Sequence, residues 1–140
     1  MEVRQVQTQQ ELDHAFQIRE DVFVREQKVP IEDEFDEYDK EALHVLAVYQ
    51  KSAAGTGRMR IIENTVKLER ICILASYRKY GIGKAIITAL ENIACDHGCK
   101  SVKLHGQVQA AGFYQKLGYQ TASEEFIEDG IPHYLMIKDL

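Results

Sequence analysis

The pattern of apolar and polar positions changes its period most clearly between residues 66 and 92. Residues 66–74 are mostly apolar and β-branched, with Glu69 and Arg70 as the interruptions, which predicts a largely buried strand. A polar, basic turn occupies residues 77–83. From Ile82 to Ala94 the apolar residues recur at helical spacing. The segment is therefore predicted to form a strand, a glycine-containing turn and a helix.

The same reasoning predicts the elements on either side of this segment. Thr8 and Glu11 match a capping box, so a helix is expected from there to about residue 24, and a shorter helix is expected over residues 109–117. Further strands are expected over residues 2–6, 44–49, 56–62, 101–105, 125–127 and 133–137. Gly55 is expected at a positive φ angle in a hairpin turn over residues 51–55. No repeat or linker divides the chain, so residues 1–140 are expected to form a single α/β (α+β) domain.

Composition narrows the class of protein. Hydrophobic residues make up 45% of the 140 residues, which is typical of a globular chain. The sequence has no apolar run of membrane-spanning length, so we expect no membrane insertion. The net charge of −5 argues against a general nucleic-acid binder. Three cysteines are too few for a disulfide framework, and a cytoplasmic location is expected.

The glycine turn before the central helix predicts an anion site. Free backbone N–H groups and the helix dipole attract phosphates at a helix N-terminus. A P-loop is excluded because Ala85 stands where Ser or Thr is required, and a Rossmann fingerprint is incomplete because Ile86 stands where its third glycine should be. The remaining pattern is Arg78-x-x-Gly81-x-Gly83.

This pattern resembles the pyrophosphate loop of the GCN5-related N-acetyltransferases (GNAT). The resemblance implies a mixed, mostly antiparallel sheet with helices on both faces, and acetyl-coenzyme A as the co-substrate. The loop residues that would hold the pyrophosphate are Arg78, Lys79, Tyr80, Gly81, Ile82, Gly83 and Lys84. In the superfamily, backbone groups of the preceding strand pair with the pantetheine arm; here they would belong to Ile71, Cys72 and Ile73.

A second motif and a short upstream segment extend the resemblance over nearly the whole chain. The run from Gln107 to Tyr119 is similar to a family motif that places Gln107 and Phe113 beside the cofactor and Tyr114 at its sulfur, although Gln107 replaces the usual Asn. The segment from Phe23 to Gln27 resembles a small branch, the YjcF/ElaA-like group. That resemblance implies that Glu26, Gln27 and His133 lie on the acceptor side.

Four features admit a chemical and a structural interpretation. Glu69 is either an ion-pair partner of Arg70 or another cation, or a general base with a raised pKa. Tyr114 is either the acid that protonates the leaving thiolate or a packed aromatic side chain. Cys72 is more simply a small buried side chain than a nucleophile. The acidic residues 31–41 are either a solvated loop or a wall that attracts a cationic acceptor.

These observations predict an N-acetyltransferase that moves an acetyl group directly from acetyl-coenzyme A to an amine. The acceptor would be a small molecule or a peptide, and its identity is open. The alternative is a non-catalytic module that binds acyl-coenzyme A and regulates a partner. No metal is expected, because Cys95, His97 and Cys99 are spaced by two residues and do not share a helix face. Many members of the superfamily dimerise, so a homodimer is a further expectation, although the sequence leaves the oligomeric state open.

Overall fold

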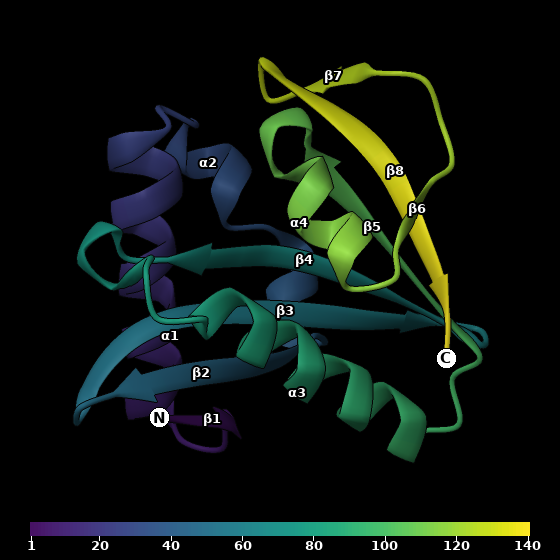
Figure 1. Cartoon of the computed structure of the whole chain (residues 1–140). Helices are drawn as coiled ribbons and strands as arrows, with labels where there is room; N and C mark the ends of the chain where they lie inside the picture. The colour runs from purple at the N-terminus through teal and green to yellow at the C-terminus, as the bar shows by residue number, and fades with distance from the viewer.

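A single mixed sheet runs through the molecule, with helices on both of its faces (Figure 1). The computed structural model describes all residues from 1 to 140. The strands follow the order β1-β2-β3-β4-β5-β8-β6, and β7 pairs with β8. Only β4 and β5 pair in parallel; all other neighbours are antiparallel. The strands are β1 (Glu2–Gln5), β2 (Leu43–Tyr49), β3 (Ser52–Ile62), β4 (Thr65–Ile73), β5 (Ser101–Gln107), β6 (Gln120–Thr121), β7 (Phe126–Glu128) and β8 (Ile131–Asp139).

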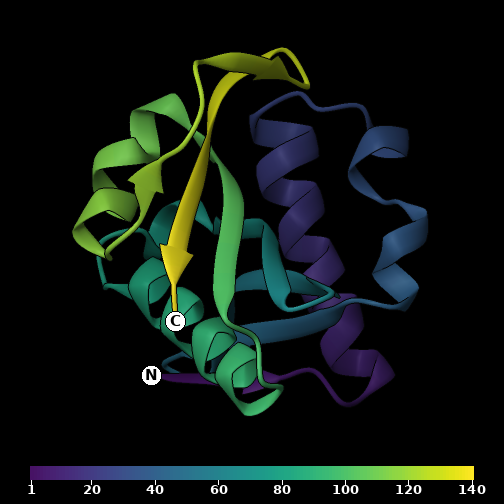
Figure 2. The same ribbon diagram turned by 90° about the vertical axis from the view of Figure 1, so that its right-hand side faces the viewer.

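The sheet separates two core layers, and helices cover each of them, as the edge-on view in Figure 2 shows. One face of the sheet packs against α3 (Ile82–Asp96), whose residues Ile82, Ile86 and Leu90 are almost fully buried. The short helix α4 (Ala111–Lys116) adjoins α3 on this face. The other face packs against α1 (Gln9–Arg19), through Ala15 and Ile18. The predicted mixed, mostly antiparallel sheet with helices on both faces is confirmed.

Local predictions are confirmed at some positions and wrong at others. The capping box forms as expected, because the backbone N–H of Glu11 donates to the Thr8 hydroxyl over 3.1 Å. The first helix continues past the expected end near residue 24 as a π-helix, η1 (Glu20–Glu26). The prediction for Gly55 is wrong, because the turn uses positive φ angles at Gln50 and Lys51 and Gly55 lies inside β3.

The acidic segment, residues 31–41, folds into a helical turn α2 (Ile31–Glu34) and a 3₁₀ turn η2 (Glu37–Lys40) that dock onto the sheet. Arg19 and Arg58 are each only 1% exposed and hold three of the segment's carboxylates together with Arg70. The shortest contacts are 2.7 Å, from Arg19 to Asp39 and from Arg58 to both Asp36 and Asp39. Neither interpretation describes Glu34, Asp36 and Asp39, because arginines hold these three carboxylates and so anchor the segment to the sheet.

The sheet opens between β4 and β5, and this opening positions the site. Their parallel pairing ends at Leu68 and Leu104, whereas β4 continues to Ile73. The register of β4 against β3 shifts between Thr56 and Arg58, which marks a β-bulge, and Arg70 takes φ +57° within it. A bulge bends its strand, so β4 turns away from β5 beyond the last pair.

Candidate active site

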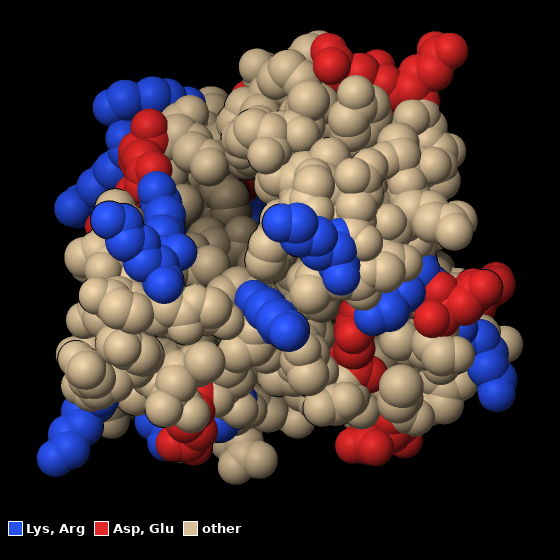
Figure 3. Space-filling view, viewed as in Figure 1, with Lys and Arg blue, Asp and Glu red and all other residues tan.

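A pocket of about 430 Å³ lies where β4 and β5 separate. Figure 3 shows the surface hollowed at this place, with basic side chains beside it. It reaches from the start of α3 to the hairpin of β7 and β8. The predicted site residues that line it are Gln27, Glu69, Ile71, Cys72, Ile73, Arg78, Gly81, Ile82, Gly83, Lys84, Gln107, Phe113, Tyr114 and His133. Glu26, Lys79 and Tyr80 are not among its lining residues.

The glycine turn at one end of the pocket has the geometry of a helix N-terminus without a side-chain cap. Gly81 is the N-cap residue at φ +73°, a conformation that glycine adopts without steric cost. Gly83 is needed for space, because a Cβ there would lie 3.2 Å from both the Ile73 side chain and the Phe113 ring. No side chain satisfies the first backbone N–H groups of the 15-residue helix α3, so these donors remain for a ligand.

Arg78 is held beside this turn by Glu26. The guanidinium donates two hydrogen bonds of 2.7 Å to the two oxygens of Glu26, and its Nε donates to the Ile73 carbonyl over 3.0 Å. The hydrogen bonds from Arg78 hold the pKa of Glu26 below its ordinary value. Glu26, expected on the acceptor side, therefore contacts Arg78 of the loop that is predicted to bind the pyrophosphate. The exposed Tyr80 of the same loop stacks on Tyr49 at a centroid distance of 4.7 Å.

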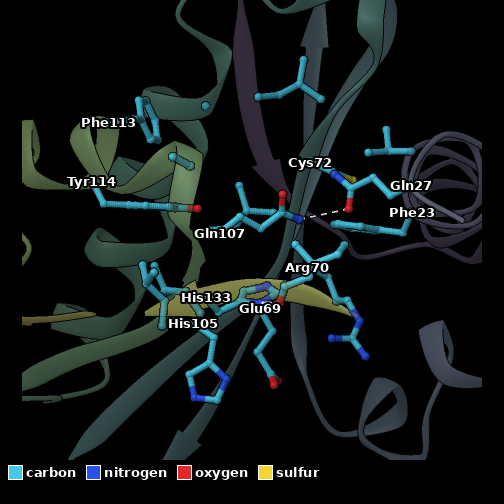
Figure 4. A pocket seen from close by; sticks show the side chains of 18 of the residues that line it. Phe23, Gln27, Glu69, Arg70, Cys72, His105, Gln107, Phe113, Tyr114 and His133 are labelled. Carbon is cyan, nitrogen blue, oxygen red and sulfur yellow. Dashed lines mark hydrogen bonds between the residues drawn. The ribbon is translucent and has the colours of Figure 1, made fainter. Parts of the chain in front are cut away.

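Two glutamine side chains meet in the pocket (Figure 4). Gln107 Nε2 donates to Gln27 Oε1 over 3.0 Å. Gln27 follows the end of η1 and Gln107 ends β5, so the bond joins two elements far apart in the sequence. The family resemblance implies that Gln27 lies on the acceptor side and Gln107 beside the cofactor, and the structure brings the two side chains into contact.

Tyr114 on α4 points its hydroxyl into the pocket, as Figure 4 shows. Its ring packs on the backbone of β5, because a Cβ on Gly106 would lie 3.1 Å from the ring carbons. Desolvation raises the pKa of Tyr114 to about 12. The phenol therefore keeps its proton throughout the neutral range, as a proton donor must.

Glu69 is an ion-pair partner of three cations. Its carboxylate lies 2.7 Å from Arg60 Nε, 3.1 Å from Arg58 Nη2 and 3.2 Å from Lys67 Nζ. Desolvation raises its pKa, but the hydrogen bond from Arg60 and the neighbouring positive charges outweigh that effect and lower the pKa to about 2. The expectation of a base with a raised pKa is wrong, and the partners are Arg58, Arg60 and Lys67 instead of Arg70.

Cys72 lines the pocket while its side chain packs in the core layer under α1, with Ala15 and Ile18. Burial raises the pKa of the Cys72 thiol well above its usual range, so little thiolate forms at neutral pH. This environment matches the structural interpretation of the residue.

Sequence reasoning missed two residues of the site, His105 and Glu128. His105 Nδ1 lies 3.0 Å from Glu128 Oε1, and His133 Nε2 lies 3.8 Å from Glu128 Oε2. Phe126 lies between the imidazoles, stacked on His133 and edge-on to His105. His105 and Glu128 come from β5 and β7, which are not adjacent in the sheet, so no spacing along the chain links them. The only signal in the sequence is the alternation of side chains along β5, which places His105 on the opposite face from the buried Leu104. No group of three metal-ligating side chains in the structure is arranged to hold a metal ion.

Comparison with known proteins gives the family. The family model of the acetyltransferase (GNAT) domain matches residues 5–140. The chain belongs to the GNAT family. An acetyltransferase of Bacillus subtilis is 57% identical over 99% of this chain and 96% of its own length. The N-acetyltransferase YjcF of the same organism is 46% identical over 94% of each chain, which agrees with the predicted branch.

A solved structure supports the same assignment. An acyl-CoA N-acyltransferase from Pseudomonas aeruginosa superposes with a TM-score of 0.86 at 26% identity, over 99% of both chains. The chain is accordingly a GNAT acyltransferase. Of the two predicted functions, this finding favours an enzyme over a non-catalytic module that binds acyl-coenzyme A. No helix combines the length and the apolar character that crossing a membrane requires.

Proposed function

We propose that this enzyme transfers an acetyl group from acetyl-coenzyme A to the primary amine of a small molecule or peptide by direct attack. The observation that carries the proposal is one continuous pocket with an uncapped helix N-terminus at one end and the opened edge of β4 along its side. The first feature suits a pyrophosphate, and the second suits an extended arm that pairs with a strand.

In this proposal the cofactor enters along β4. The backbone N–H groups at Gly81 to Lys84 bind the pyrophosphate, and the positive charge of Lys84 supports them. Backbone groups of Ile71, Cys72 and Ile73 pair with the pantetheine arm, and Phe113 covers it. The thioester then lies near the Tyr114 hydroxyl.

The chemical step consists of attack, collapse and proton transfer. The neutral amine attacks the thioester carbonyl carbon, the C–S bond breaks, and Tyr114 gives its proton to the departing sulfur. The proton that the attacking nitrogen loses then restores the Tyr114 phenol. Gln27 and Gln107 supply amide groups at the junction of the two substrates, where their mutual hydrogen bond is exchanged for bonds to the bound molecules.

The test is release of free thiol from acetyl-coenzyme A in the presence of spermidine, tyramine, L-lysine and the peptide Ala-Ala-Ala, each paired with mass spectrometry of the acetylated product. We expect at least one amine to be acetylated. Calorimetric titration with coenzyme A is run on the same protein. Coenzyme A binding without transfer to any amine would overturn the amine acceptor, and absence of coenzyme A binding would overturn the donor.

A further inference from the structure

Some charged side chains that line the pocket are paired with an opposite charge, and others are not. Glu34 is held by Arg19 and Arg70, Glu69 by Arg58, Arg60 and Lys67, and Arg78 by Glu26. The lining residues with no Lys, Arg, Asp or Glu partner are Lys84, Glu128 and Asp129. Lys84 stands at the start of α3, whereas Glu128 and Asp129 stand on the hairpin of β7 and β8. The pocket therefore keeps a free positive charge at the cofactor end and free negative charge at the opposite end.

The carboxylate of Glu128 lies between the side chains of two histidines, His105 and His133. One oxygen contacts His105 at 3.0 Å, and the other oxygen faces His133 at 3.8 Å, which is beyond hydrogen-bond length. The Nδ1 of His133 bonds the Ile131 carbonyl over 2.7 Å, so this ring is fixed by its own strand. The second oxygen of Glu128 thus has no hydrogen bond of ordinary length to either histidine.

His105 lies at the point where the strands part. It is the first residue of β5 beyond the last pair with β4, and Glu69 is its counterpart on β4. The contact of Nδ1 with Glu128 fixes the tautomer in which Nδ1 carries the proton, which leaves the Nε2 lone pair to accept another. The charged and titratable groups that share this part of the pocket are Glu128 from β7, His133 from β8, and Glu69 and Lys67 from β4.

We propose that Glu128 binds the ammonium group of the acceptor and that His105 takes its proton. The ammonium N–H donates to the second Glu128 oxygen, and one proton moves from the nitrogen to His105 Nε2. The nitrogen lone pair that this releases forms the bond to the carbonyl carbon as the C–S bond breaks, and the sulfur is protonated by Tyr114. The nitrogen then gives its second proton, through solvent, to the Tyr114 oxygen, which restores the phenol and leaves a neutral amide. Glu128 stabilises the imidazolium that results, and the imidazolium returns its proton to solvent.

This inference rests on the proposed function and assigns it a substrate class, an acceptor that is cationic at neutral pH. It also places the recognition of charge on β7 instead of on the acidic segment 31–41, whose inner carboxylates are held by arginines.

The experiment compares His105→Gln and Glu128→Gln with wild type, using the fastest amine among spermidine, tyramine, L-lysine and Ala-Ala-Ala. His97→Gln is the matched control, because His97 is exposed and bonds only the Ile93 carbonyl of its own helix. For His105→Gln we expect kcat to fall by about 10²-fold, the usual reach of one positioned base, with the Kd of coenzyme A unchanged. For Glu128→Gln we expect the KM of the amine to rise about 10-fold, as for loss of one charge-assisted hydrogen bond.

Two further readouts separate these roles from a structural one. In His105→Gln the acid limb of the kcat/KM profile should be lost, because the imidazole that takes the proton from the acceptor is absent. In wild type saturated with coenzyme A, spermidine should shift the imidazole ¹⁵N signals of His105, and Glu128→Gln should abolish that shift.

The possible outcomes distinguish this inference from the function on which it rests. Wild-type kcat and pH profile in His105→Gln, with an amine still acetylated, would overturn the base and leave the acetyltransferase intact. An unchanged amine KM in Glu128→Gln would overturn the ammonium site. If no amine is acetylated, the NMR titration decides: an unmoved His105 signal overturns the ammonium site, and a shift lost in Glu128→Gln supports it.

Discussion

At the scale of single residues, Tyr114 combines a packed ring with a hydroxyl that faces the pocket. Tyr114→Phe keeps the packing against Gly106 and removes the proton. Because desolvation raises the pKa of Tyr114 to about 12, the wild-type phenol is protonated across the neutral range. We expect kcat to fall by about 10²-fold or more, with melting temperature and coenzyme A affinity unchanged. Wild-type kcat in the Phe variant, under conditions where chemistry limits the rate, would remove Tyr114 from the mechanism.

Glu69 is expected to stabilise the fold without acting as the base. Its pKa of about 2 lies below the unfolded value near 4.5, so its contribution is present above pH 4.5 and is lost as pH falls through 2. Glu69→Gln should lower the free energy of unfolding by about 3 kcal/mol at pH 7, the equivalent of this pKa difference. Urea unfolding should show the gap closing between pH 5 and pH 2. A gap that does not depend on pH would contradict the assigned pKa.

Which residues the sequence identified depends on how local their signals are. Gly81, Gly83 and Tyr114 belong to motifs with fixed spacing along the chain, and the structure places all three at the pocket. The pairing of Glu69 with Arg58 depends on the register of β3 against β4, and the contact of His105 with Glu128 on the arrangement of β5, β7 and β8. Composition and the period of the pattern carry no information on such long-range contacts, so the sequence alone neither decides the chemical role of Glu69 nor points to His105.

At the scale of elements, the π-helix η1 is joined to the cofactor loop through Glu26 and Arg78. The pair is partly exposed, with side chains 44% and 41% accessible, and such pairs contribute about 0.2–1 kcal/mol. A pyrophosphate that recruits Arg78 must displace Glu26. We therefore expect Glu26→Gln to bind coenzyme A about 1.4- to 5-fold more tightly, the range that this free energy converts to.

The control for this prediction comes from the same helix. Glu20 also lies on η1, but it contacts Arg25 instead of the cofactor loop, so Glu20→Gln should leave the affinity unchanged. Calorimetric titration of both variants with coenzyme A measures the difference. Weaker binding by Glu26→Gln would mean that Glu26 positions Arg78 for the ligand instead of competing with it.

The long elements were predicted because their periods are unambiguous, as in β4 and α3. The two-residue strand β6 and the four-residue turn α2 are too short to show a period and were not predicted. The bulge at Arg70 was also invisible, because arginine does not favour a positive φ angle and only the surrounding sheet holds it there. The pattern of the sequence therefore does not reveal the opening of the sheet, which creates the pocket.

At the scale of the whole molecule, buried charges join α1 and the acidic segment 31–41 to the central strands β3 and β4. Arg19 and Arg58 are both held in contact with Asp39, and Arg58 also reaches Asp36 and Glu69. Desolvation raises the pKa of Asp36 and Asp39, but hydrogen bonds from the arginines outweigh it and lower both values. Protonation of these carboxylates leaves buried guanidinium groups without partners, so acid is expected to weaken the attachment of the segment 31–41.

His44 extends this acid sensitivity to a milder range. It is 6% exposed, its Nε2 contacts the Asp39 carbonyl at 2.9 Å, and its Nδ1 is buried without a partner. Desolvation lowers the pKa of His44 below its ordinary value of 6.5, so between the two values the unfolded chain binds the extra proton and the folded chain does not. Titration of His44 therefore lowers the stability as pH decreases below 6.5, before Asp36 and Asp39 titrate.

The measurement that checks this behaviour is the urea midpoint at pH 7.5, 6.5 and 5.5 for wild type, His44→Gln and His97→Gln. We expect the midpoint of wild type to fall across this interval and that of His44→Gln to fall less, whatever its absolute stability, because the titrating group is gone. His97 is exposed, so His97→Gln should follow wild type. Glu34 opposes the trend, since desolvation raises its pKa and favours the folded state on acidification. An identical pH slope in His44→Gln and wild type would show that His44 does not control the loss.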